Sequence, residues 1–182
     1  MSLLTRVFVG TCGSPGSIRA LRYARTMAAD GEAAALIPVH AWMPPGGDVA
    51  DRRAPNPTLR KVWQEAAWQR LWDSIDAAWG GPPDDLDMWP VVVRGKAGEV
   101  LVGLASRPDD VLVVGGGRRG QLARLFHGQV ARYCVARAGC PVLAVPPSPL
   151  ERYVGRRPRA LSFRHHGLNA GEALNGLDHN IT

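Results

Sequence analysis

The residues most suited to chemistry lie in a glycine- and arginine-rich segment, VVGGGRRGQLARLFHGQV, which spans Val113–Val130. Glycines such as Gly115 and Gly117 let backbone N–H groups come close to an anion, and a helix opening near Gly128 adds unpaired N–H groups and a favourable dipole. Arg118 can grip a phosphate through two parallel hydrogen bonds. The segment therefore predicts a phosphate-binding loop; the alternative is a glycine-rich turn with solvated arginines.

Two common nucleotide motifs are excluded by the surroundings of these glycines. The spacing Gly115-x-Gly117-x-x-Gly120 matches a dinucleotide fingerprint, but that motif follows the first strand and needs an acidic residue about 20 positions later. No Asp or Glu occurs between Asp110 and Glu151, and the Gly-Lys-Ser/Thr of a P-loop is absent from the sequence. We therefore expect neither a dinucleotide site nor a P-loop.

Cys12 is the strongest candidate nucleophile, because it precedes a predicted helix whose N-terminus favours a thiolate. However, six residues separate Cys12 from Arg19, one too many for a phosphatase-like loop. His40 and His127 have no carboxylate partner in sequence that would orient them for acid–base work, and the aspartates of Asp84–Asp87 are expected to be solvated. We expect no catalytic residue, no metal site and a buried packing role for Cys12.

Apolar runs alternate with helical patterns along the chain. The five expected strands are Leu3–Thr11, Ala33–Trp42, Met88–Arg94, Val111–Val114 and Pro141–Val145. Helices are expected over Ile18–Ala28, Thr58–Trp79, Lys96–Ser106 and Gln129–Ala138, and Asp48–Pro57 is expected to be a mobile connection. Cys134 and Cys140, in and just after the last helix, are expected to pack in the core.

Strands that are continuously apolar and separated by helices predict an α/β domain with a five-stranded parallel sheet and helices on both faces. Pro90 cannot donate a backbone hydrogen bond, so it places the start of the third strand at an edge of the sheet. Ligands of such sheets bind beyond the carboxyl ends of the strands, where the winding reverses. The turn after Thr11, the end of the second strand and the loop after Val114 therefore define one candidate site.

The longest predicted helix carries a stripe of large apolar residues. Trp68, Trp72, Ile75 and Trp79 recur at i, i+4, i+7 and i+11, which places them on one face. Core packing or a contact with a partner helix is the expected role of this stripe, and a ligand box is the alternative.

Composition indicates one globular domain of ordinary type, since the chain has 182 residues of which 46% are hydrophobic. Three cysteines without a metal-binding spacing, and no apolar run long enough for a membrane span, favour a cytoplasmic protein. The formal net charge is +6, but the arginines form no stripe with interleaved aromatic residues, so we expect no nucleic-acid partner. The domain is expected over residues 1–147, and the tail of residues 148–182 is expected to be mostly disordered or to form a short docking helix.

The order of these segments resembles the universal stress protein family over about Leu3–Pro147. The opening strand and turn, VFVGTCGSPGS, and the closing strand, CPVLAV, are similar to those of the family. Members that bind ATP carry glycine, two residues, glycine, nine residues, glycine and then serine or threonine. Gly115 and Gly128 fit the first and last glycines with the spacing kept. The resemblance implies a fold with strand order 3-2-1-4-5.

Three positions depart from the family pattern. Arg118 replaces the second glycine, Gln129 replaces the serine or threonine next to Val130, and Cys12 replaces an aspartate beside the nucleoside. Arg118 either fills the space of a phosphate or holds it. By the same resemblance, backbone groups of Ala41 meet the adenine and Val39 lines it.

The resemblance implies a small regulatory or sensory protein of the stress response that binds ATP, with or without Mg²⁺, or another adenine nucleotide. It also implies a homodimer that pairs the fifth strands. The alternatives are a nucleotide-free module, whose Trp68, Trp72 and Trp79 face recruits a protein partner, and an enzyme that cleaves phosphate esters at the same loop.

Overall fold

The computed structural model describes residues 6–30, 35–116, 127–146 and 148. Within them, five parallel strands form one sheet in the order β3-β2-β1-β4-β5, as predicted. The strands are β1 (Arg6–Thr11), β2 (Ala35–Trp42), β3 (Val91–Arg94), β4 (Val111–Gly115) and β5 (Val142–Val145). The helices are α1 (Pro15–Asp30), α2 (Gly47–Arg53), α3 (Pro57–Trp79), α4 (Ala97–Leu104) and α5 (His127–Arg137).

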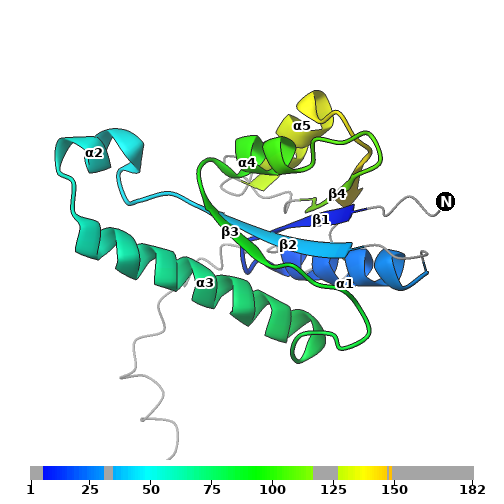
Figure 1. The fold of residues 1–182 in the computed structure, drawn as a ribbon. Helices are drawn as coiled ribbons and strands as arrows, with labels where there is room; N and C mark the ends of the chain where they lie inside the picture. Colours follow the sequence, from blue (N-terminus) through cyan, green and yellow to red (C-terminus); the bar gives the residue numbers. More distant parts are fainter. Residues whose placement is uncertain (1–5, 31–34, 117–126, 147, 149–182) are drawn as a thin grey trace, which may run out of the picture.

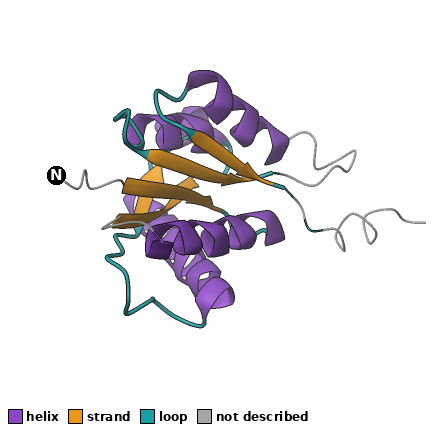
Figure 2. Ribbon diagram, turned by 90° about the vertical axis from the view of Figure 1, so that its right-hand side faces the viewer, coloured by secondary structure: helices purple, strands orange, loops and turns teal. Residues whose placement is uncertain are grey.

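Helices cover both faces of the sheet (Figure 1, Figure 2): α1 and α3 pack on one face, and α4 and α5 pack on the other. Alternate residues of β1 serve the two layers, since Val7 and Val9 belong to the core cluster under α1 while Phe8 belongs to the cluster under α4 and α5. A strand buried on both faces needs apolar residues at successive positions, which explains its sequence. Cys134 and Cys140 pack in the second cluster, as expected.

The strand β3 lies at one edge of the sheet and is shorter than predicted. The sequence predicted a strand from Met88, but Met88 forms only an isolated bridge with Leu36 and the regular strand begins at Val91. Pro90 interrupts the run, because it has no N–H to donate and is tolerated only at the margin of a sheet.

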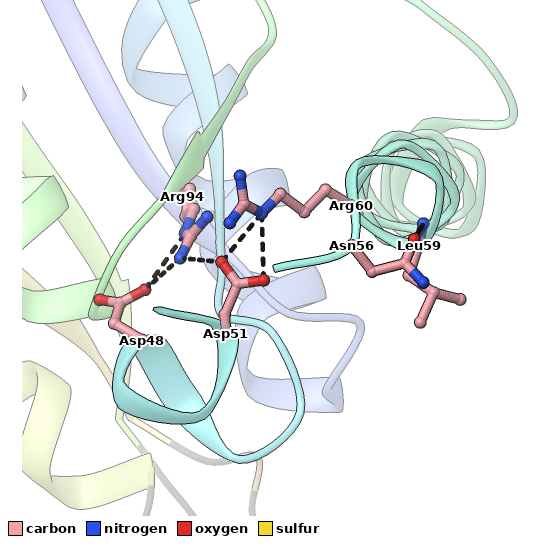
Figure 3. Close-up of polar contacts among 6 residues, drawn as sticks. All are labelled: Asp48, Asp51, Asn56, Leu59, Arg60 and Arg94. Carbon is pink, nitrogen blue, oxygen red and sulfur yellow. Dashed lines mark hydrogen bonds and ion pairs between the residues drawn. The ribbon is translucent and has the colours of Figure 1, made fainter. Parts of the chain in front are cut away.

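The segment Asp48–Pro57 is not the mobile connection that the sequence predicted, because most of it folds as α2. Figure 3 shows the reason. The carboxylate of Asp51 accepts hydrogen bonds from Arg60 Nε at 2.9 and 3.0 Å and from Arg94 Nη2 at 2.8 Å. Arg94 also donates to Asp48 at 2.6 and 3.1 Å. These ion pairs fasten α2 to the first turn of α3 and to the end of β3.

The long helix α3 has well-defined ends. The side chain of Asn56 accepts from the N–H of Leu59 at 3.0 Å, as an N-cap should. Gly80 has a φ of 76° and stops the helix in the left-handed conformation. Arg22, from α1, donates to the last-turn carbonyls of Ala77 and Ala78 at 2.9 and 3.1 Å, and so satisfies groups that a helix end leaves open.

The predicted tryptophan stripe is only partly in the core. The buried residues of α3 are Ala67, Leu71, Ser74 and Ile75. Trp79 packs against the cluster under α1, whereas Trp72 is 39% exposed. Of the stripe, Ile75 is buried and Trp72 lies at the surface, because the inward side of the helix is centred on Ala67 and Leu71 and not on the tryptophans.

Candidate functional site

The strand ends converge where the winding of the sheet reverses, between β1 and β4. The pairing of these two strands ends at Val9 and Val113, although β1 continues to Thr11 and β4 continues to Gly115. The two strands therefore part over their last two residues. This is the position at which parallel sheets bind ligands.

The turn between β1 and α1 is held by its own hydroxyl groups. Ser14 accepts from the N–H of Ser17 at 3.3 Å, and the hydroxyl of Ser17 donates to the carbonyl of Ser14 at 2.9 Å. The N–H of Cys12 donates to the hydroxyl of Ser17 at 3.3 Å. Ser14 is thus the N-cap of α1 and Pro15 its first residue, a combination that favours helix initiation.

Cys12 is exposed at the rim of this turn, with its Sγ 3.2 Å from the hydroxyl of Ser14. The expected buried packing role for Cys12 is therefore wrong. The reason is its position: β1 ends at Thr11, so Cys12 lies in the turn before α1 and outside the part of the strand that is buried between the two helical layers. Cys12 offers a polarizable thiol, and no carboxylate, at the site.

Gly115 has a structural task that a loop motif does not reveal. A Cβ atom at this position would lie 2.6 Å from the backbone C and O of Gly16 and 2.9 Å from the N of Ser17. Only glycine permits this approach between the end of β4 and the first turn of α1. The next residue, Gly116, donates its N–H to the carbonyl of Val145 at 2.7 Å, which continues the connection to β5.

At the end of β2, the predicted base-site residues lie in different environments. The side chain of Val39 is 1% exposed and packs in the cluster under α4 and α5, so it does not line the rim of the sheet. Ala41 is half-buried and lies one residue beyond the last pair between β1 and β2, Thr11 with His40. Its backbone is thus past the end of β1, where the resemblance places the adenine.

His40, near the end of β2, is buried, with 5% of its surface exposed. Its Nδ1–H donates to the carbonyl of Thr11 at 3.0 Å; since a carbonyl only accepts, this bond fixes the tautomer. Burial lowers the pKa of His40, the bond to Thr11 opposes that shift, and the charge of Arg70 adds to it. His40 is therefore neutral at pH 7 and holds two strand ends together.

The N-terminus of α5 completes the site as far as the structure describes it. Gly128 lies in the first turn of this helix, Gln129 is exposed beside it, and the half-buried Val130 packs against the cluster under α4. Gly117 and Arg118 lie outside the described residues. One edge of the sheet thus holds Cys12, Ala41, Gly115 and Gln129. Val39 and Val130 belong to the apolar core behind this edge.

Sequence reasoning missed the roles of Thr11, Ser14 and Ser17 in this site. The hydroxyl of Thr11 donates to the carbonyl of Val39 at 3.3 Å, which ties the ends of β1 and β2. The pattern Ser14-Pro15-Gly16-Ser17 is a recognisable capping signal, so the serine contacts could have been predicted.

Two further classes of site were sought in the described ranges. No three His, Cys, Asp or Glu residues of these ranges come together in a way that could hold a metal ion. No helix in the described ranges is both long enough and apolar enough to span a membrane.

Comparison with known proteins identifies a family and several similar solved structures. The model of the Universal stress protein family matches residues 4–146. A universal stress protein solved in complex with cAMP shares 30% identity over 78% of this chain and 95% of its own, with a TM-score of 0.47. The hypothetical protein MJ0577 shares 17% identity over 80% of this chain and 97% of its own, with a TM-score of 0.61.

The universal stress protein UspA from Lactobacillus plantarum shares 18% identity over 78% of this chain and 97% of its own, with a TM-score of 0.52. At these identities, MJ0577 and UspA are similar to this chain in fold. No curated protein sequence is significantly similar to it.

Proposed function

The chain belongs to the universal stress protein family, and we propose that it binds an adenine nucleotide, ATP or a smaller relative, at the carboxyl edge of its sheet. The observation that carries this proposal is the parting of β1 and β4 after Val9 and Val113, with α1 and α5 both beginning at that edge. Helix N-termini and glycine backbones at a winding reversal are suited to phosphates. In this reading the protein is a small regulatory or sensory component of the stress response.

In this proposal, different residues at the edge of the sheet contact the base and the phosphates of the nucleotide. The backbone of Ala41 is available to an adenine because it lies past the last pair between β1 and β2. Such a backbone contact does not depend on the type of side chain. The exposed amide of Gln129, in the first turn of α5, can donate to a phosphate oxygen where a shorter hydroxyl would otherwise stand. With bound nucleotide, Mg²⁺ would be held mainly by the phosphates.

The exposed Cys12 changes the electrostatics of the proposed site. A cysteine in place of an aspartate leaves the rim without the carboxylate that would stand close to a polyanion. It also removes an acceptor for a sugar hydroxyl or a base amine. Compared with an aspartate, Cys12 therefore recognises the sugar less specifically and repels the phosphates less.

We propose binding and regulation, not turnover, as the task of this site. His40, the histidine nearest the strand ends, is committed to the Thr11 carbonyl and its pKa is lowered. A neutral imidazole whose N–H is engaged is poorly placed to act as a general acid.

The test is thermal unfolding of the full chain with ATP, ADP, AMP or cAMP at millimolar concentration, each with and without Mg²⁺, and with GTP as the control for the base. A ligand at 100 times its Kd stabilises a protein by about 2.7 kcal/mol, which raises the melting temperature by several degrees. Acid extraction and chromatography of the purified protein would show nucleotide that had been retained. No shift with any adenine nucleotide and no retained nucleotide would refute the proposal and favour the nucleotide-free module.

Position 118 offers variants with opposite expected effects. If Arg118 holds a phosphate, Arg118→Ala reduces the shift that ATP produces. If Arg118 instead fills the phosphate position, Arg118→Gly restores the family glycine and increases that shift. Arg132→Ala, at an exposed position farther along α5, is the matched control, and it should leave the shift unchanged.

A further inference from the structure

We propose that the arginine-rich segment Arg152–His166 of this chain docks on the outward face of α3, a surface we call the acidic face. The acidic face consists of Val62, Glu65, Gln69, Trp72, Asp73 and Asp76. This proposal is independent of nucleotide binding, because it concerns the outer surface of a helix and not the carboxyl edge of the sheet.

The acidic face lies opposite the side of α3 that packs on the sheet. The buried residues Ala67, Leu71, Ser74 and Ile75 occupy one side of the helix. At 3.6 residues per turn, the residues of the acidic face project from the other side. All of them are exposed, including Val62 at 51% and Trp72 at 39%, and α3 follows the outer border of its layer in Figure 1.

The carboxylates of the acidic face differ from the carboxylates that anchor the fold. Asp48, Asp51 and Asp110 each form an ion pair with an arginine. Among the residues that the structure describes, Glu65, Asp73 and Asp76 form none, and Asp73 accepts only an amide hydrogen bond from Gln69 at 2.8 Å. Lys61 and Arg70 flank the face on the same helix. The result is a negative strip with two apolar side chains in a chain of net charge +6.

The segment Arg152–His166 has the complementary composition. It reads RYVGRRPRALSFRHH and contains five arginines, no Asp or Glu, and the apolar residues Leu161 and Phe163. Arginines can pair with the carboxylates and stack on Trp72, while Phe163 can cover the apolar surface beside it. Two acidic faces would repel each other, so a second copy of α3 is a poor occupant.

The length of chain before this segment is sufficient for it to reach α3. Phe163 is 15 residues beyond Ser148, the last residue described, and an extended chain of that length spans about 50 Å. The whole of α3, with 23 residues, is about 34 Å long. The helix α1 packs against both β5, where the tail begins, and α3, so only one helix separates the two. Tethering also gives the segment a high effective concentration at this surface.

The experiment is limited tryptic digestion of the full chain, read by mass spectrometry as the rates of cleavage after Arg156, Arg159 and Arg164. The variant Glu65→Gln/Asp73→Asn/Asp76→Asn removes the charges of the acidic face. The control Asp84→Asn/Asp87→Asn/Glu99→Gln makes the same change in net charge at other exposed positions. Thermal unfolding of all three proteins verifies that each is folded.

At low ionic strength we expect the face variant to be cleaved about tenfold faster than the unchanged protein and the control variant to be cleaved at the unchanged rate, because a docked segment is cleaved only when it is released. High salt should raise the rate of the unchanged protein toward that of the face variant. Equal rates in all three proteins would overturn the proposal. So would protection that rises with protein concentration, since the segment would then be docking on another copy of the chain.

Discussion

Gly115 shows how one missing side chain joins two elements at the site. Because a Cβ here would lie 2.6 Å from the backbone of Gly16, and backbone cannot turn aside as a long side chain can, Gly115→Ala must separate β4 from α1. Overpacking of this kind costs about 1–3 kcal/mol. We therefore expect the melting temperature to fall by several degrees, as measured by circular dichroism or calorimetry.

The control for this substitution is Gly103→Ala, in α4, where a Cβ would meet nothing within 4 Å. Alanine is a better helix former than glycine by about 1 kcal/mol, so this variant should be as stable as the unchanged protein or more stable. If Gly115→Ala unfolded at the same temperature as Gly103→Ala, the close approach of β4 to α1 would be contradicted.

His40 makes the stability of the fold depend on pH with a definite sign. Its pKa is lowered in the folded protein by burial, from an ordinary value of 6.5. As the pH falls below that value, the unfolded chain binds a proton on His40 while the folded protein does not, so the free energy of unfolding decreases. The loss continues until the pH passes the lowered pKa, and above about pH 7 this group adds no pH dependence.

The variant His40→Asn tests this sign, because an amide can still donate to the carbonyl of Thr11 but does not titrate. Chemical denaturation at pH 7.5 and 5.5 should show that the unchanged protein loses more stability on acidification than the variant. Equal losses would mean that His40 titrates normally in the folded state. Since the other histidines are present in both proteins, their contributions cancel in this comparison.

At this scale, the sequence could predict which residue types stand at the site but not what each one does. The sequence predicted Gly115 as a glycine of a phosphate-binding loop. The structure shows a further reason for glycine at this position, which is the close approach of α1. That contact is invisible in the sequence because Gly16 lies 99 positions away. Cys12 was expected to be buried, although the predicted strand already ended at Thr11, because the sequence does not show how far the turn after β1 is covered by the rest of the protein.

Among the elements, α2 depends most on distant side chains. Asp51 is 2% exposed at its side chain, yet it lies at the periphery under Arg60 and Arg94 and not in an apolar core. A short helix of this kind has little stability of its own, so these ion pairs decide whether it is ordered. The sequence predicted a mobile connection for Asp48–Pro57, because the arginines that pair with Asp51 belong to α3 and β3 and not to this segment.

The variant Asp51→Asn should therefore loosen α2 while leaving the sheet intact. Hydrogen exchange of residues 47–53 at pH 7 is expected to accelerate severalfold, and amides of β1 and β4 should change little. Asp48→Asn is the matched control: it removes the same charge from the same helix, but Asp48 is half-exposed and bonds only Arg94, so its effect should be smaller. Equal exchange in all three proteins would contradict the anchoring role.

The effect of Asp51 also has a pH dependence with a known direction. The bonds from Arg60 and Arg94 lower the pKa of this carboxyl below its ordinary value of 3.8. Its contribution is therefore complete above about pH 5 and is lost as the pH falls through the lowered pKa. The difference in exchange between Asp51→Asn and the unchanged protein should persist at pH 5 and shrink as the pH falls through the lowered pKa, below which both carry a neutral side chain.

The strands were predictable where α2 was not, because their signal is local. Runs such as Val111–Val114 are short, rich in valine and apolar at every position, which is typical of a strand buried on both faces. The strand order, in contrast, followed from the resemblance to the family. At the level of the whole molecule, that order leaves β3 and β5 as the two edges of the sheet.

The edge strand β5 has backbone groups that point away from the sheet. The carbonyls of Pro141 and Val145 accept from Leu112 and Gly116 at 3.0 and 2.7 Å, so these residues face β4. Backbone directions alternate along a strand, so Val142 and Ala144 direct their N–H and C=O groups to the side of β5 where the described residues place no other strand. We propose that this edge pairs with β5 of a second copy, because an exposed strand edge is a template for pairing and identical chains assemble most often across a two-fold axis.

The variant Ala144→Pro tests this pairing without removing a bond inside the sheet, because the N–H of Ala144 faces outward. Light scattering after size exclusion should give about twice the chain mass of 19.6 kDa for the unchanged protein and the single mass for Ala144→Pro. Ala144→Val keeps the N–H and favours a strand, so it should remain dimeric. A monomeric unchanged protein, or an Ala144→Pro variant that is folded and still dimeric, would place the interface of any assembly elsewhere than on β5.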